Sequence, residues 1–127
     1  MKNHKIYKMT FSSIYPMYVN KVVRKDKNVE DLDIILIWLT GYNQNQLDKL
    51  KESEDTLEEF FDNAPMINPN TNLITGLICG IRVEDIEEDL MQKIRYMDKL
   101  VDELAKGKSM DKILRKSSTT LFFLMIN

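Results

Sequence analysis

The clearest hydrophobic pattern in the chain runs over residues 83–105, where apolar side chains return every three or four positions. They are Val83, Ile86, Leu90, Ile94, Met97, Val101 and Leu104. This spacing places all of them on one face of a helix. Acidic residues are concentrated in the first turns, where the helix dipole favours negative charge. Lys106-Gly107-Lys108 follows the last apolar position and is typical of a helix C-terminus. The pattern therefore predicts one long amphipathic helix.

Capping signals divide the rest of the chain into shorter helices. Thr56 and Glu59 have the spacing of a capping box, and Pro16 falls in the first turn of the first helix. Residues 32–39 are apolar almost without a break, so we expect a helix that is buried nearly all round. The N-cap candidates are Ser12 or Ser13, Asn28, Asn43, Thr56, Asn68 and Ser109.

These signals predict an all-α fold in a single compact domain over residues 1–127. We expect six or seven helices, several of them short, around one long helix in the C-terminal half that begins at 83 or 89 and ends near 106. Residues 1–11 would form an N-terminal arm, and residues 117–127 an apolar C-terminal extension.

Composition narrows the function classes. The chain has 127 residues, 43% of them hydrophobic and 30% charged, with a net charge of -2, which argues against a large nucleic-acid footprint. The N-terminus lacks the apolar region of a signal peptide, and the longest apolar run within the predicted domain, residues 34–39, is far too short for a membrane span. We expect a cytoplasmic protein that binds no membrane.

No motif for metal, cofactor or nucleophilic chemistry stands out. The pairs Glu84/Glu88 and Asp85/Asp89 lie four residues apart, but His4 is the only histidine, and acids at a helix start have a simpler electrostatic reason. Cys79, the only cysteine, has apolar neighbours and is expected to be buried and structural. Gly76 and Gly80 fit no phosphate loop, so we expect close helix packing or a break before Val83. We predict no metal site and no cofactor.

A helix-turn-helix is one alternative function-bearing motif. Residues 33–39, the turn Thr40-Gly41-Tyr42 and residues 44–50 have the required lengths. Side chains of the second segment are of types that read bases or touch phosphates, but the acids at 52, 54 and 55 would repel DNA, so nucleic acid is a disfavoured partner. The candidate residues are Gln44, Asn45, Gln46 and Lys49.

A small-ligand or enzyme pocket is the second alternative. It would need polar and aromatic residues beside apolar runs to converge in space. The candidates are Tyr15, Tyr42, Asn68, Arg82, Arg95 and Tyr96.

Two sets of basic residues would form a patch if they adjoin, although helix dipoles explain both sets more simply. They are Lys21, Arg24, Lys25 and Lys27, and Lys106, Lys108, Lys112, Arg115 and Lys116.

Several longer motifs resemble a bacterial family of uncharacterised proteins, domain of unknown function 2200. They are IYPMYV (14–19), WLTGY (38–42), NPN (68–70), LITGLICGIRVE (73–84) and IRYMDKLVDELAKGKSMDKILR (94–115). The resemblance covers residues 5–115 and implies a small cytoplasmic protein, with no activity, cofactor or catalytic residue to transfer. Relatives often have proline in place of Asp89, which implies a joint near Glu88 and a dependable helix over residues 89–106. Relatives also tend to end near residue 115.

The function predicted from the sequence is a non-enzymatic protein-interaction or binding module. The heptad-like seam of the long helix and the apolar extension make a second copy of the chain the first partner to consider, so a homo-oligomer is expected.

Overall fold

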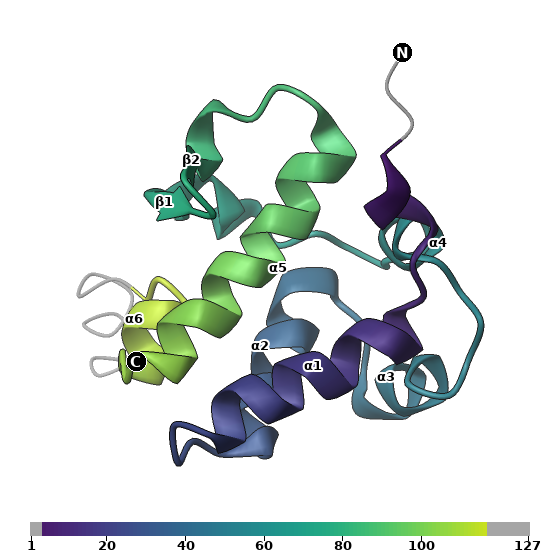
Figure 1. Cartoon of the computed structure of the whole chain (residues 1–127), viewed down its shortest axis with the longest axis horizontal. Coiled ribbons are helices and arrows are strands. Elements are labelled where there is room, and N and C mark those ends of the chain that lie inside the picture. The colour runs from purple at the N-terminus through teal and green to yellow at the C-terminus, as the bar shows by residue number, and fades with distance from the viewer. Residues whose placement is uncertain (1–3, 117–127) are drawn as a thin grey trace, which may run out of the picture.

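The structure is a computed structural model that describes residues 4–116 (Figure 1). It is mostly helical, which confirms the all-α prediction, with one small hairpin as its only sheet among these residues. The helices are α1 (Phe11–Val23), α2 (Val29–Thr40), α3 (Gln44–Leu50), α4 (Leu57–Asp62), α5 (Asp89–Ala105) and α6 (Met110–Ile113). The 3-10 turns are η1 (Lys5–Lys8), η2 (Pro69–Leu73) and η3 (Val83–Asp85), and the strands are β1 (Leu77–Ile78) and β2 (Ile81–Arg82).

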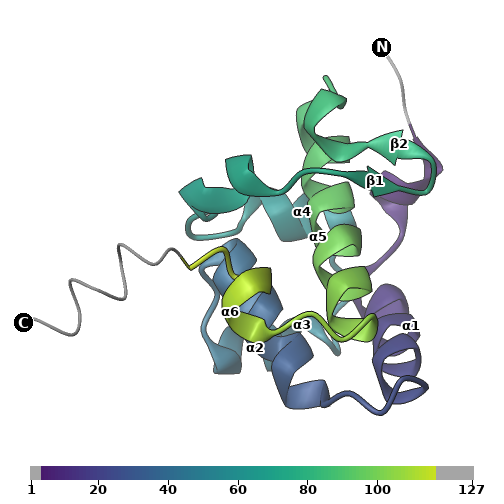
Figure 2. The ribbon, with the colours of Figure 1, turned by 90° about the vertical axis from the view of Figure 1, so that its left-hand side faces the viewer.

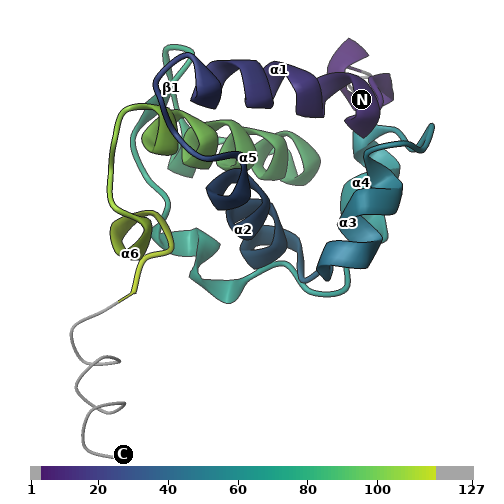
Figure 3. The same cartoon turned by 90° about the horizontal axis from the view of Figure 1, so that it is seen from below.

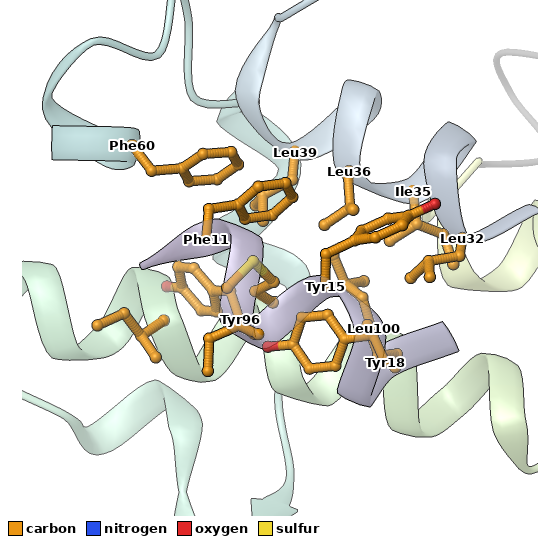
Figure 4. Close-up of a cluster of buried hydrophobic side chains, with 14 of the residues drawn as sticks. Phe11, Tyr15, Tyr18, Leu32, Ile35, Leu36, Leu39, Phe60, Tyr96 and Leu100 are labelled. Carbon is orange, nitrogen blue, oxygen red and sulfur yellow. The ribbon is translucent and has the colours of Figure 1, made fainter. Parts of the chain in front are cut away.

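The core lies where α1, α2 and α5 pack on one another (Figure 4). Leu32, Leu36 and Leu39 of α2 are fully buried there. Phe11 extends the core toward α4, where its ring stacks on that of Phe60 with centroids 4.3 Å apart. Burying large aliphatic and aromatic side chains in this way is the main force that holds short helices together.

The long helix begins at Asp89, and Val83–Asp85 forms the separate turn η3, so the joint predicted near Glu88 is confirmed. The apolar stripe of α5 faces inward, with Ile94, Met97 and Leu100 fully buried. The seam that suggested an oligomer is therefore used inside the chain, against α1, α2 and α4.

Helix α2 is less buried than predicted. The side chain of Ile34 is 46% exposed, and Ile37 and Trp38 are only partly buried. The prediction was wrong because α1, α3 and α5 contact α2 on its other sides and leave this stripe toward solvent. A continuous apolar run does not distinguish full burial from three-sided burial.

The segment around Gly76 and Gly80 was expected as closely packed helix or as a break before Val83, and it forms a β-hairpin. Leu77 pairs with Arg82, and Ile78 pairs with Ile81. Cys79 and Gly80 have φ angles of 52° and 79°, the two consecutive positive values of a type I′ turn. Cys79 is exposed at this turn, so the prediction that it is buried was wrong.

The N-terminal arm is held by backbone contacts to the segment before α4. The amide of Phe11 donates to the carbonyl of Asp55 over 3.0 Å, and the amide of Leu57 donates to Met9 over 2.8 Å. The predicted apolar extension, residues 117–127, lies outside the described residues. Among residues 4–116, no helix is long and apolar enough to cross a membrane.

Candidate functional site

The hairpin is held on α5 by one buried side chain and several polar contacts. Ile78 of β1 is buried, and Figure 2 shows the hairpin lying across α5. The ammonium of Lys99 donates to the carbonyl of Leu77 over 3.1 Å. At the base of the hairpin, the amide of Val83 donates to the carbonyl of Gly76 over 2.9 Å. The burial of Ile78 and the hydrogen bond from Lys99 fix the orientation of the hairpin relative to the helix, and the Val83–Gly76 hydrogen bond closes the hairpin itself.

Once fixed, the hairpin presents large apolar side chains to solvent. Leu77 is 58% exposed and Ile81 is 52% exposed. They lie on paired strands, and the register Leu77↔Arg82 and Ile78↔Ile81 places them on opposite faces of the hairpin, with Leu77 on the face of Arg82. We call these two side chains the apolar hairpin surface. Leu73, at the end of η2, precedes the hairpin in the sequence and is 52% exposed.

Two opposite charges border this surface. Arg82 and Glu84 form an ion pair with an N–O distance of 3.5 Å, and the guanidinium of Arg82 is largely exposed. The carboxylate of Glu84 also accepts the backbone N–H of Gly76 over 2.9 Å. That hydrogen bond, with smaller help from Arg82, lowers the pKa of Glu84. An apolar centre bordered by fixed charges is the usual anatomy of a protein–protein contact.

A second polar cluster joins α1, α2 and α3. The buried carboxylate of Asp33 accepts the hydroxyl of Tyr15 over 2.5 Å and the ammonium of Lys51 over 2.7 Å. Burial and the hydrogen bond to Asp33 raise the pKa of Tyr15 to about 12. Burial alone would lower the pKa of Lys51, but its hydrogen bonds to Asp33 and Asp48 raise it. Every charge in this cluster has a partner of opposite sign, so its role is structural.

Two of the helix-turn-helix candidates, Gln44 and Gln46, form hydrogen bonds within this cluster or within the N-terminal cap of α3. The amide of Gln44 donates to the carboxylates of Asp33 and Asp48, each over 2.9 Å. Gln46 closes the capping box of α3 with Asn43. Asn45 and Lys49 stay exposed. A helix whose first side chain faces two carboxylates is poorly placed on a phosphate backbone.

Two tyrosines from the pocket candidates are buried in the same hydrophobic core but have different surroundings. The hydroxyl of Tyr42 donates to the carbonyl of Phe60 over 2.6 Å, and its burial raises the pKa to about 12. Tyr96 lies on α5, where burial and then the charge of Asp89 raise its pKa.

The remaining pocket candidates also have partners of their own. Asn68 caps η2 by accepting the amide of Asn70 over 2.8 Å. Arg95 donates to the carboxylate of Asp98 over 2.8 Å, and Asp98 also accepts the hydroxyl of Tyr18 over 2.5 Å. Within residues 4–116, no hydrogen bond or ion pair joins two of the six candidates, so the pocket remains a prediction without support from these contacts.

The two basic sets do adjoin. Asp102 of α5 binds Lys21 of α1 over 3.1 Å and Lys106 over 3.0 Å. Burial would raise the pKa of Asp102, but the hydrogen bonds from Lys106 and Lys21 lower it. Figures 1 and 3 show the C-terminal ends of α1 and α5 side by side. We call this region the basic end, and it consists of Lys21, Arg24, Lys25, Lys27, Lys99, Lys106, Lys108 and Lys112.

Sequence reasoning missed three acids that organise these clusters. Asp33, Asp98 and Glu103 belong to amphipathic helices, and a charged residue on a mostly apolar face is the only signal that could have identified them. Glu103 is almost fully buried and binds the guanidinium of Arg115 through both oxygens. Its partner is twelve residues away, beyond the reach of helical periodicity. Among residues 4–116, no group of three or more His, Cys, Asp or Glu side chains is placed to hold a metal ion.

Comparison with known proteins identifies the family. The family described as uncharacterized protein conserved in bacteria, DUF2200, matches residues 5–115. The chain belongs to this family. A crystal structure of "uncharacterized protein SP1917" is 41% identical, with a TM-score of 0.84 over 91% of this chain and 94% of that chain. No curated protein matches the chain.

The match with this crystal structure supports the fold, whereas its description supplies no activity. The hairpin and the basic end both lie within the residues that the family matches. The geometry of these two regions is therefore the best guide to what the protein does.

Proposed function

We propose that this DUF2200 protein is a non-enzymatic interaction module that associates with a second copy of itself through the apolar hairpin surface. The observation that carries the proposal is the pair of large aliphatic side chains, Leu77 and Ile81, each more than half exposed on a hairpin that α5 holds in place. Large apolar side chains that stay exposed on an ordered element are candidates for contact with a partner.

The charges beside the surface favour a second copy as the partner. Arg82 and Glu84 lie next to each other with opposite signs. In a two-fold interface, residue i of one copy meets residue j of the other, and j meets i. Arg82 of each copy would then face Glu84 of its partner, while Leu77, which shares a hairpin face with Arg82, would pack against its counterpart. A surface that carries both signs in this way is complementary to itself.

Other exposed apolar residues are poorer candidates. On α1, Met17 and Val23 are 59% and 51% exposed and line one surface hollow, but they share it with the polar side chains of Asn20 and Arg24. Single exposed apolar residues are normal on soluble proteins. The apolar stripe of α5 is not available as an interface with another chain, because α1, α2 and α4 cover it.

The expected association is weak. Two aliphatic side chains per copy contribute roughly 1.5–3 kcal/mol each on burial, and the cost of association consumes much of that gain. We therefore expect a monomer–dimer equilibrium that favours dimer only at chain concentrations on the order of 0.5 mM.

We further propose that the protein works in the cytoplasm, where its exposed thiol, Cys79, would stay reduced.

Light scattering at several concentrations tests this proposal. The wild-type mass should rise toward the dimer value at high concentration, and Leu77→Ser should stay monomeric because a hydroxyl replaces the central aliphatic group. Met17→Ser is the matched control, since Met17 has the same exposure on α1. The proposal fails if the wild type stays monomeric throughout, or if both variants associate as the wild type does.

A further inference from the structure

The basic end carries more positive charge than the local carboxylates neutralise. Asp102 binds Lys21 and Lys106, and Glu103 binds Lys108. Within residues 4–116, no ion pair involves the other five cations of the basic end. They are Arg24, Lys25, Lys27, Lys99 and Lys112. The chain as a whole has a net charge of -2, so this surplus is local to one end.

Helix dipoles account for part of this arrangement. The C-terminal ends of α1 and α5 both lie here, and lysines stabilise the carbonyl groups at such ends. The dipole effect fades within the last turn of a helix, however. Lys99 lies nearly two turns before the end of α5, and Lys112 lies on α6 beyond it. The dipole of α5 therefore does not explain these two positions, although Lys99 also donates to the carbonyl of Leu77 and Lys112 lies in the last turn of the short helix α6.

Four of these five cations, all but Lys27, line two adjoining hollows in the surface. One hollow, at the C-terminal end of α5, is lined by Lys99, Lys106, Lys108 and Lys112. The second, between α1 and α5, is lined by Lys21, Arg24, Lys25 and Lys106. Asp102 and Lys106 line both hollows, and Glu103 lines the first, so the two hollows form one basic depression that the Asp102–Lys106 ion pair divides.

We propose that this depression binds a small ligand that carries two or more linked phosphate groups. Ammonium groups that converge from several elements on one hollow suit the oxygens of a phosphate, and two adjoining hollows suit a chain of phosphates. Nucleic acid is a poorer fit for the site. Its extended backbone would pass the carboxylates that lie among these lysines, and no aromatic residue lines either hollow for base stacking.

Calorimetric titration of the full chain with inorganic triphosphate tests the proposal. Triphosphate should bind at least about tenfold more tightly than orthophosphate, because it spans both hollows, and its affinity should fall steeply with added salt. Lys112→Glu and Lys25→Glu each reverse a cation that has no ion pair within residues 4–116, one from each hollow, and each should weaken triphosphate binding at least about fivefold.

Lys49→Glu is the matched control, since Lys49 is an exposed lysine on α3 outside both hollows, and it should bind triphosphate like the wild type. Leu77→Ser should also bind normally, which separates this site from the hairpin. The proposal is overturned if triphosphate does not bind at millimolar concentration, or if Lys49→Glu loses as much affinity as the hollow variants. Tighter lysine-dependent binding of a DNA duplex than of triphosphate would overturn it in favour of nucleic acid.

Discussion

Helix α5 and the β1–β2 hairpin touch each other, yet they place their apolar residues in opposite directions. Leu100 of α5 is fully buried, whereas Leu77 of the hairpin is 58% exposed. The helix turns one continuous stripe toward α1, α2 and α4. The hairpin buries Ile78 on α5 and leaves Leu77 and Ile81 outside. Apolar periodicity thus identifies residues that hold the fold together, and the residues available to a partner lie where the fold has no further element to cover them.

The largest expected effect comes from a matched pair of truncations. Leu100→Ala should lower the free energy of unfolding by about 2–5 kcal/mol, because it leaves a cavity in the core. Leu77→Ala should change it by less than about 0.5 kcal/mol in the monomer, because the side chain is mostly hydrated already. Chemical denaturation at low protein concentration measures both. Equal losses would contradict the division into inward and outward apolar residues.

A pair of glycines sharpens the same comparison. Gly41 ends α2 with φ at 79°, and an added Cβ would lie 2.9 Å from the amide nitrogen of Met66. Gly80 in the hairpin has the same φ, but a Cβ there would meet nothing within 4 Å. Gly80→Ala should cost about 1 kcal/mol from backbone strain alone, and Gly41→Ala about 2–4 kcal/mol from strain and overpacking.

Thermal unfolding of the two glycine variants at one pH gives the difference directly. If Gly80→Ala proved as costly as Gly41→Ala, the hairpin turn would have to be packed against something, and its exposure would be wrong.

Alkaline pH should lower the free energy of unfolding through tyrosines in the core rather than through residues of the hairpin. Burial raises the pKa of Tyr15 and of Tyr42 to about 12, above the unfolded value near 10. A raised pKa means that the stabilisation is complete below pH 10 and is lost as the pH rises toward 12. Each tyrosine should remove roughly 1–3 kcal/mol over that window.

Denaturation as a function of pH checks this expectation, with Tyr42→Phe as the variant that should flatten the decline. A free energy of unfolding that stays constant from pH 10 to 12 would show that these hydroxyls ionise as easily in the folded chain as in the unfolded one.

Sequence patterns predicted α5 well because its information is local. The spacing of Ile94, Met97 and Val101 defines a helical face, and the family comparison placed its start near Asp89. The capping box at Thr56 and Glu59 is equally local, and the structure shows both of its hydrogen bonds.

The hairpin could not be predicted in the same way. Its turn is Cys79-Gly80 rather than the Asn-Gly or Asp-Gly pair that signals a type I′ turn, and strands of two residues are too short to show alternation. Sequence patterns did not predict the Asp33 cluster for a different reason. Its partners Tyr15 and Lys51 are each eighteen residues away, and only packing brings them together.

Hydrogen exchange as a function of protein concentration tests the central claim most directly. We predict that the backbone amides of the hairpin, residues 77–82, exchange severalfold more slowly at millimolar than at micromolar concentration, while those of α5 exchange equally at both. Leu77→Ser should abolish the difference and Met17→Ser should keep it. Protection that rises along α5, or that does not change in the hairpin, would contradict self-association through the apolar hairpin surface.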